Sequence, residues 1–301
     1  MSPTDLLLRT TGYAGALLCI GGVVAQVLLR RAWKSEGDAA ALEAAIKRLT
    51  LVAFIGALFL PLAAWVSLTV QSLQLVDEGE VIGAAHYSMA LGSNWGMAWK
   101  AQVAAAILAI LAWIPFRGRP FFGWRLTPIV ALGLAATYPL TGHPRSLDIG
   151  PLLGVLNQSL HVIGAGIWLG TLGILATVAW IGDADGRGDR VRRIITLFSP
   201  LALTGAAMLG VSGTITGVQT VGSFGAIFGT NYGRTLALKL LPLAGVAGIG
   251  AYNWKVVQPK LEAGEGHGLL RRSAFAELTL GAVLLFITAL FCFHAVNHSR
   301  I

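Results

Sequence analysis

The sequence contains a long apolar segment, NQSLHVIGAGIWLGTLGILATVAW, from Asn157 to Trp180. It holds no charged residue and exceeds the roughly 20 residues that a helix needs to cross a bilayer. Glycine, aliphatic residues and tryptophan make up most of it, as is typical of a transmembrane helix. The sequence therefore predicts a membrane span here, with a single histidine, His161, inside it.

Composition extends this prediction to the whole chain. Hydrophobic residues make up 55% of the 301 and charged residues only 12%, a balance that excludes a soluble globular domain. The net charge of +8 does not indicate nucleic-acid binding, because the basic residues lie at the ends of apolar segments. Cys19 and Cys292 both lie inside apolar runs, which favours neither a disulfide framework nor a thiol metal motif.

Further apolar runs along the chain are also long enough to form membrane spans. We predict eight transmembrane helices, at residues 12–31, 49–71, 93–114, 124–140, 151–181, 196–219, 232–256 and 274–296. The fourth is short and contains Pro128 and Pro139. The expected fold is therefore all-α and polytopic, with one transmembrane domain over residues 1–301.

Most of the 22 Lys and Arg residues fall in the connections after the first, third, fifth and seventh spans. Positively charged connections stay on the cytoplasmic side of a membrane. We therefore expect both termini on the outer side.

Two helix starts resemble each other and suggest an internal repeat. Ser93-Asn94-Trp95-Gly96 precedes the third span and Thr230-Asn231-Tyr232-Gly233 precedes the seventh. Units of four helices would make the halves, residues 1–120 and 140–301, parallel to each other. The alternative is that asparagine, an aromatic residue and glycine simply mark where a helix enters the membrane.

The predicted topology places five of the six histidines on the outer side, with only His267 inside. His161 lies about 15 Å into its helix at 1.5 Å per residue, where a polar ring needs a partner or a ligand. Imidazole suits copper, zinc, iron and nickel, and a nearby thioether favours cuprous copper. The candidate metal ligands are His86, His143, His161, His294, His298 and Met89.

Each candidate also has an ordinary structural interpretation. Asn157, one turn before His161, could hold that ring by a hydrogen bond, and Trp168 could serve packing alone. We expect Lys239 and Glu277 to reach an interface, with an ion or proton route as the alternative. No phosphate-binding loop, Gly-x-Ser-x-Gly elbow or His-Glu-x-x-His motif occurs, so we do not expect an enzyme.

Several ordered motifs resemble the copper resistance protein D (CopD) family. They are Gly142-His143, Leu160-His161-Val162, Trp168-Leu169-Gly170, Phe198-Ser199-Pro200-Leu201-Ala202, Ser212-Gly213, Thr230-Asn231-Tyr232-Gly233-Arg234 with Lys239, and Tyr252-Asn253-Trp254. Their order and spacing are compatible with the family from about residue 140 to residue 256. The chain departs from the family pattern at Gln102, where a basic residue is common, and at Trp254, where arginine is usual.

The resemblance implies a bacterial inner-membrane protein of copper uptake or copper tolerance, acting with a separate periplasmic copper-binding protein of the CopC type. It also implies supporting roles near the metal for Trp168, Tyr232 and Lys239. Two other functions stay open. A haem-binding redox protein would use His161 and His294 as axial ligands, and a copper sensor or assembly factor would bind the metal without moving it.

Overall fold

The computed structural model describes residues 3–33, 39–77, 79–116, 119–120, 123–141, 150–179, 187–221 and 231–297. Most of the described chain is helical, as predicted. The helices are α1 (Pro3–Ala32), α2 (Ala39–Leu73), α3 (Ala84–Gly92), α4 (Asn94–Trp113), α5 (Gly123–Thr137), α6 (Pro151–Ala165), α7 (Thr171–Val178), α8 (Arg187–Val221), α10 (Asn231–Tyr252), α11 (Gln258–Glu262) and α12 (His267–Asn297).

Shorter elements join these helices. A 3-10 turn, η1 (Tyr138–Thr141), follows α5, and a two-stranded antiparallel ribbon of β1 (Pro115–Phe116) and β2 (Arg119–Pro120) follows α4. Two π-helical turns, η3 (Gly166–Gly170) and η4 (Asn253–Val257), extend α6 into α7 and α10 into α11. Such turns are rare inside helices and occur often at functional sites.

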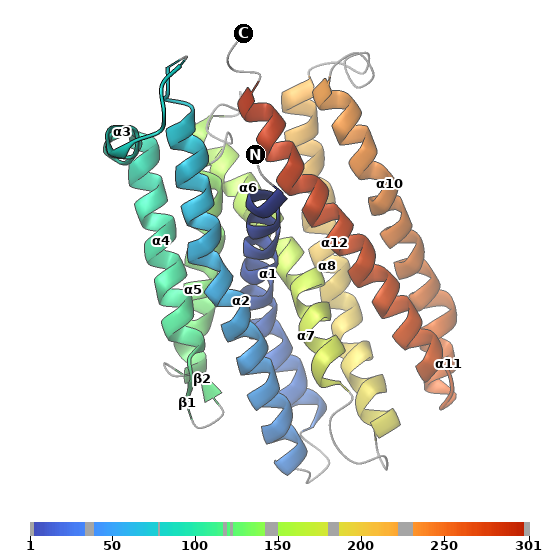
Figure 1. Cartoon of the computed structure of the whole chain (residues 1–301). Coiled ribbons are helices and arrows are strands. Elements are labelled where there is room, and N and C mark those ends of the chain that lie inside the picture. Colours follow the sequence, from blue (N-terminus) through green and yellow to red (C-terminus); the bar gives the residue numbers. More distant parts are fainter. Residues whose placement is uncertain are drawn as a thin grey trace.

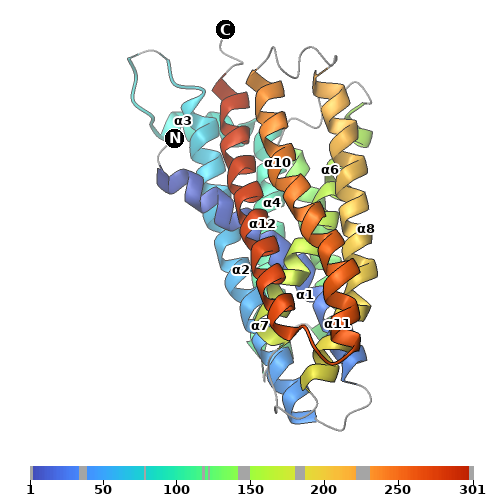
Figure 2. The same ribbon diagram turned by 90° about the vertical axis from the view of Figure 1, so that its right-hand side faces the viewer.

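Helix α1 lies at the centre of the bundle (Figures 1 and 2). It contacts α2, α5, α6, η3, α7, α8 and α12. The long helices alternate in direction, so α1 begins and α12 ends at the same end of the molecule (Figures 1 and 2).

Glycines let α1 approach its neighbours backbone to backbone. A Cβ on Gly15 would overlap the backbone of Gly56 in α2, and one on Gly170 of η3 would overlap the backbone of Leu17. Small residues play this role where lipid removes the hydrophobic drive for helix association and packing must supply it. Gly166 and Gly170 of η3 therefore allow a close contact with α1.

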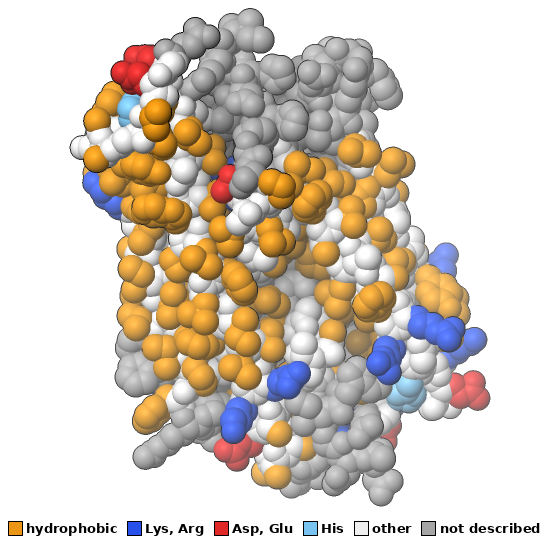
Figure 3. All heavy atoms as spheres, in the orientation of Figure 1, with side chains coloured by type: hydrophobic (Ala, Val, Ile, Leu, Met, Phe, Trp, Pro, Cys, Tyr) orange, Lys and Arg blue, Asp and Glu red, His pale blue; other side chains and the backbone are white. Residues whose placement is uncertain are grey.

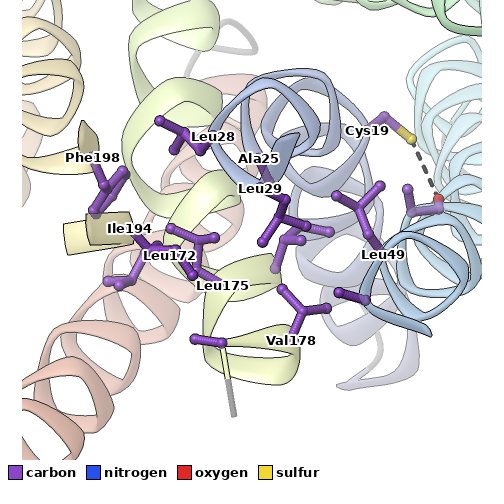
Figure 4. Packing of buried hydrophobic residues seen from close by; sticks show 14 of the residues in the cluster. Cys19, Ala25, Leu28, Leu29, Leu49, Leu172, Leu175, Val178, Ile194 and Phe198 are labelled. Carbon is purple, nitrogen blue, oxygen red and sulfur yellow. Dashed lines mark hydrogen bonds between the residues drawn. The ribbon is translucent and has the colours of Figure 1, made fainter. Parts of the chain in front are cut away.

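Aliphatic side chains fill the space between α1, α2, α7 and α8, toward the end of the bundle opposite the start of α1 (Figure 4). Leu28 and Leu29 of α1 meet Leu49 of α2 and Val178 of α7 there, and each is at most 1% exposed. The Cys19 thiol lies 3.6 Å from the Ala53 carbonyl oxygen, where it acts as a weak donor (Figure 4). Cys19 is therefore part of the packing, in line with its apolar surroundings in the sequence.

Six helices of the described chain are long and apolar enough to cross a membrane: Pro3–Ala32, Ala39–Leu73, Asn94–Trp113, Pro151–Val178, Gly188–Gln219 and His267–Leu290. The other two predicted spans are also helical, as α5 with η1 and α10 with η4, but they are not among these six. Helix α5 has 15 residues, about 22 Å at 1.5 Å per residue, less than the roughly 30 Å of the hydrocarbon core. The all-α membrane fold is confirmed, while the count of eight and the repeat stay predictions.

Several helices begin well before the predicted apolar runs. Helix α2 begins at Ala39, α8 at Arg187 and α12 at His267. Hydropathy marks only the lipid-embedded part of a helix, whereas the polar turns beyond it have no such signal. Arg190 lies in one of these extensions; it is 3% exposed, with its guanidinium carbon 5.7 Å from the centre of the Trp33 ring.

The surface of the bundle fits a membrane protein. Figure 3 shows hydrophobic side chains over the middle of one face, with most of the Lys and Arg side chains toward its lower end. That end holds the last turn of α1, with Arg30 and Arg31, and the first turns of α2, α8 and α12. The chain is therefore a multi-pass membrane protein, with charge gathered at the end opposite its termini.

Candidate functional site

His161 lies on α6, half-buried against α8. Its Nδ1 lies 2.9 Å from the hydroxyl oxygen of Ser212, and that hydroxyl donates to the Met208 carbonyl oxygen at 2.6 Å. Because a serine hydroxyl has one proton, its oxygen accepts from His161 Nδ1 in this arrangement. Nε2 then carries the lone pair. A histidine that binds a metal through Nε2 has this same tautomer, with a hydrogen bond from Nδ1–H holding the ring in place.

Asn157 secures the same helix contact one turn away. Its amide nitrogen donates to the Ser212 carbonyl oxygen at 3.1 Å and to the Thr216 hydroxyl at 3.0 Å. The Thr216 hydroxyl donates in turn to the Ser212 carbonyl oxygen at 3.0 Å. Asn157 therefore fixes the position of Ser212, and through it the orientation of His161.

Glycines bring α6 and α8 close enough for these hydrogen bonds. A Cβ on Gly164 would lie 2.8 Å from the Gly205 carbonyl oxygen and 2.9 Å from Met208 Cβ. A Cβ on Gly213 would lie 3.8 Å from His161 Cε1. The imidazole thus stands beside the α8 backbone, with Met208 one helical turn further along the contact.

Trp168 occupies the next part of this interface. Its side chain is partly buried against the main hydrophobic cluster. A Cβ on Gly205 would lie 3.1 Å from Trp168 Cβ, so the tryptophan packs closely against a position that lacks a side chain. The contacts of Trp168 are those of packing, and its role near a metal stays a prediction.

His86 uses both ring nitrogens within the connection between α2 and α4. The Gly83 backbone N–H donates to Nδ1 at 3.1 Å, which closes the first turn of α3, and Nε2 lies 3.4 Å from a carboxylate oxygen of Glu80. Met89, one turn later on α3, is 59% exposed. A metal on His86 Nε2 would therefore have to replace the contact with Glu80.

The other predicted residues are only partly described. His143 and His298 lie outside the described residues, as do the side chains of His294, Tyr232 and Lys239. Within the ranges described, no three His, Cys, Asp or Glu side chains converge. A joint site of the predicted histidines stays a prediction, and so does the His161–His294 pair that haem would require.

Two residues of α8 were not predicted from the sequence to lie near His161. Ser212 is the partner of the imidazole, where the sequence suggested Asn157, and Met208 places a thioether residue in the same helix contact. Their spacing of four residues, on one face of an otherwise apolar span, was a signal that could have indicated them.

We expect Asn157→Leu to lower the free energy of unfolding by about 1 kcal/mol, the usual value for polar contacts between membrane helices. The change removes the bonds to Ser212 and Thr216 of α8. Ser159→Ala is the matched control, because Ser159 is also buried on α6 but donates only to Val155 of its own helix. Thermal unfolding in detergent measures both; equal losses would contradict this role of Asn157.

Comparison with known proteins gives a consistent result. The family described as Copper resistance protein D matches residues 192–291, and the one described as Copper resistance protein D-like, N-terminal domain, matches residues 2–148. The Copper transport protein CutJ of Bacillus subtilis (strain 168) is 29% identical over 202 residues, which cover 65% of this chain.

The chain spans 36% of the length of that curated relative. No solved structure matches the chain. Both family descriptions name copper resistance protein D, and the two matches together cover most of the sequence. The chain belongs to the copper resistance protein D family.

Proposed function

We propose that this protein carries copper across the membrane toward the cytoplasm and that His161 is its ligand inside the membrane. The observation that carries the proposal is the pairing of His161 Nδ1 with Ser212, which directs the Nε2 lone pair to a ligand. Family membership and the name of the relative, a copper transport protein, support copper as the cargo. Transport of an ion needs no enzymatic step by this chain.

The charge distribution indicates which end of the bundle faces the cytoplasm. Basic residues gather at the end opposite the chain termini, and such ends face the cytoplasm. Helix α6 begins at the other end, so His161 lies about 15 Å in from the outer surface. Copper from outside would reach His161 before the middle of the bundle.

Cuprous copper fits the chemistry of this position best. Imidazole nitrogen and thioether sulfur are both ligands of Cu⁺, and Met208 lies in the same α6–α8 contact. A cation with one charge also costs less to desolvate than one with two. We therefore include Met208 with His161 in the proposed site.

The outer loop would capture copper before it enters. His86 and Met89 are three residues apart on α3, so their side chains are neighbours on one helix face. The carboxylate of Glu80 beside His86 adds negative charge that attracts cations. His143, His294 and His298 are further proposed ligands at this end, and a separate CopC-like protein is the proposed donor of copper.

Ser212→Ala should weaken Cu⁺ affinity by about 10- to 100-fold, the usual cost of losing the hydrogen-bond partner behind a histidine ligand. The variant removes the acceptor that holds Nδ1–H and so lets the ring rotate. Thr214→Ala is the matched control, because Thr214 is exposed on the same helix and donates only to Gly210. Competition with a Cu⁺ chelator measures both affinities, and equal affinity for the two variants would contradict the role of Ser212.

Copper uptake into vesicles tests the proposed function. Purified protein is reconstituted into liposomes, and proteolysis of exposed loops establishes its orientation in each preparation. We expect copper to accumulate when the outer face of the protein points outward, and protein-free liposomes give the background. Uptake equal to background, or net movement in the opposite direction, would overturn the proposal.

A further inference from the structure

Glu277 is a buried acidic residue inside a membrane span. It lies on α12, within the candidate span His267–Leu290, and only 6% of it is exposed. The prediction that Glu277 reaches an interface is therefore wrong: the residue packs against α10 and η4 instead of pointing along its helix to water. An acidic residue in such a position is costly and needs a specific partner.

That partner is the amide of Asn253, the first residue of the π turn η4. The amide nitrogen of Asn253 donates to Glu277 Oε1 at 2.9 Å. The other amide atom, Oδ1, is buried and has no hydrogen-bond partner among the described residues. A buried acceptor without a donor costs roughly 1–3 kcal/mol, so its position beside a carboxyl group needs an explanation.

A proton on Glu277 supplies that explanation. A neutral carboxyl group has one O–H to donate, whereas an ionised carboxylate can only accept. A carboxylic acid and an amide can therefore pair in both directions, with the amide N–H donating to one carboxyl oxygen and the carboxyl O–H donating to the amide oxygen. An ionised Glu277 would instead place negative charge next to the lone pairs of Asn253 Oδ1, in a medium of low dielectric constant.

We propose that Glu277 and Asn253 form a proton-binding site inside the membrane, with the proton held on Glu277 in this conformation. Among the side chains that the structure describes, no charged group pairs with Glu277 in competition with the proton. Helix α12 packs against α1, α7, α10 and η4, and α7 has no titratable side chain. Among the described side chains, none of the other titratable groups on these elements pairs with Glu277; they are Asp5, Arg9, Tyr13, Cys19, Arg30, Arg31, Tyr252, Lys255, His267, Arg271 and Arg272.

A groove lies between the two helices that carry this site, and its lining includes residues next to the site along the chain. It has a volume of about 540 Å³ and lies between α10 and α12, lined by Gly248, Tyr252, Leu269, Arg272 and Ser273 among others. Ser273 lies one turn before Glu277 on the same face of α12, and Tyr252 directly precedes Asn253. The lining residues belong to the last turns of α10 and the first turns of α12. These turns lie toward the end where α11 joins the two helices, which is the proposed cytoplasmic end (Figures 1 and 2).

Release of the proton would act on the helices themselves. Without the proton, the contact between α12 and η4 loses one hydrogen bond and gains a repulsion. Protonation of Glu277 therefore favours the packed arrangement of α10 and α12, and its loss favours their separation. The site is independent of copper and would hold a proton even if the chain moved no metal.

Infrared spectroscopy of the full-length protein in lipid nanodiscs, without copper, tests the proposal. We expect a C=O stretch of a protonated carboxylic acid at neutral pH, which Glu277→Gln removes completely. This variant should fold, because a glutamine amide can also pair with Asn253 in both directions. Glu262→Gln is the matched control: Glu262 is exposed on α11, and its loss should leave the band unchanged.

Asn253→Leu provides a second variant. It removes the N–H that donates to the carboxyl C=O, so the band should move to higher frequency. Three results would each overturn the proposal: no protonated-carboxyl band in the wild-type protein at neutral pH, a band that persists in Glu277→Gln, or a band that Asn253→Leu leaves unshifted. The first result can be read from the wild-type protein alone. None of the three depends on copper transport, so failure of the proton-site proposal is distinguishable from failure of the proposed function.

Discussion

Gly170→Leu should prevent α1 from packing and leave little folded protein in the membrane. A Cβ at position 170 would overlap the backbone of Leu17, and a Cβ on Gly21 would overlap the backbone of Gly170. No rotamer relieves such an overlap, because the atoms in conflict belong to two backbones. Overpacking of a core costs about 1–3 kcal/mol where side chains can shift, and we expect Gly170→Leu to exceed that range because a whole helix has to move.

Gly210→Leu is the control for this change. Gly210 lies in the helical interior of α8, and a Cβ there meets no atom within 4 Å. The amount of folded protein in detergent extracts, followed by size-exclusion chromatography, measures both variants. A Gly170→Leu protein as abundant and as stable as Gly210→Leu would show that the contact between α1 and η3 does not set the fold.

His161→Ala should reduce copper uptake to the background of protein-free vesicles. The change removes the imidazole and the hydrogen bond to Ser212, but it leaves the close approach of Gly164 to Gly205 between α6 and α8 unchanged. The fold should therefore survive, which thermal unfolding can verify. His267→Ala is the matched control, since His267 begins α12 at the opposite end of the bundle from the start of α6.

Uptake by His267→Ala should stay near that of the wild type. Equal loss in both variants would indicate that removal of either histidine disturbs the bundle, with no special role for His161. Full uptake by His161→Ala would remove this residue from the copper route.

Much of the fold could be predicted from hydropathy, because a membrane-spanning helix needs a long apolar run that few other structures require. The predicted run from residue 124 to residue 140 coincides closely with α5 and η1. Helix α3 was not predicted, because it is short and lies in a connection that hydropathy treats as a loop. The π turn at Gly166–Gly170 also has no hydropathy signal, because it changes only the backbone hydrogen bonding of an apolar run.

The site was predictable only in part, for a related reason. A lone histidine in an apolar span indicates a partner or a ligand, but hydropathy does not say which neighbouring helix supplies it. Ser212, which holds His161, is 51 residues away on α8, and the packing of Gly164 against Gly205 helps to bring the two helices together. Glu277 illustrates the same limit, because its burial follows from the position of Asn253 on another helix.

A Cu⁺ titration of the purified wild-type protein and of His161→Ala, in competition with a chelator of known affinity, shows whether His161 binds the metal. We expect a tight Cu⁺ site in the wild type whose affinity falls by at least about 100-fold in His161→Ala, beyond the usual effect of losing only the hydrogen-bond partner of a ligand. Unchanged stoichiometry and affinity in His161→Ala would show that His161 is not a copper ligand.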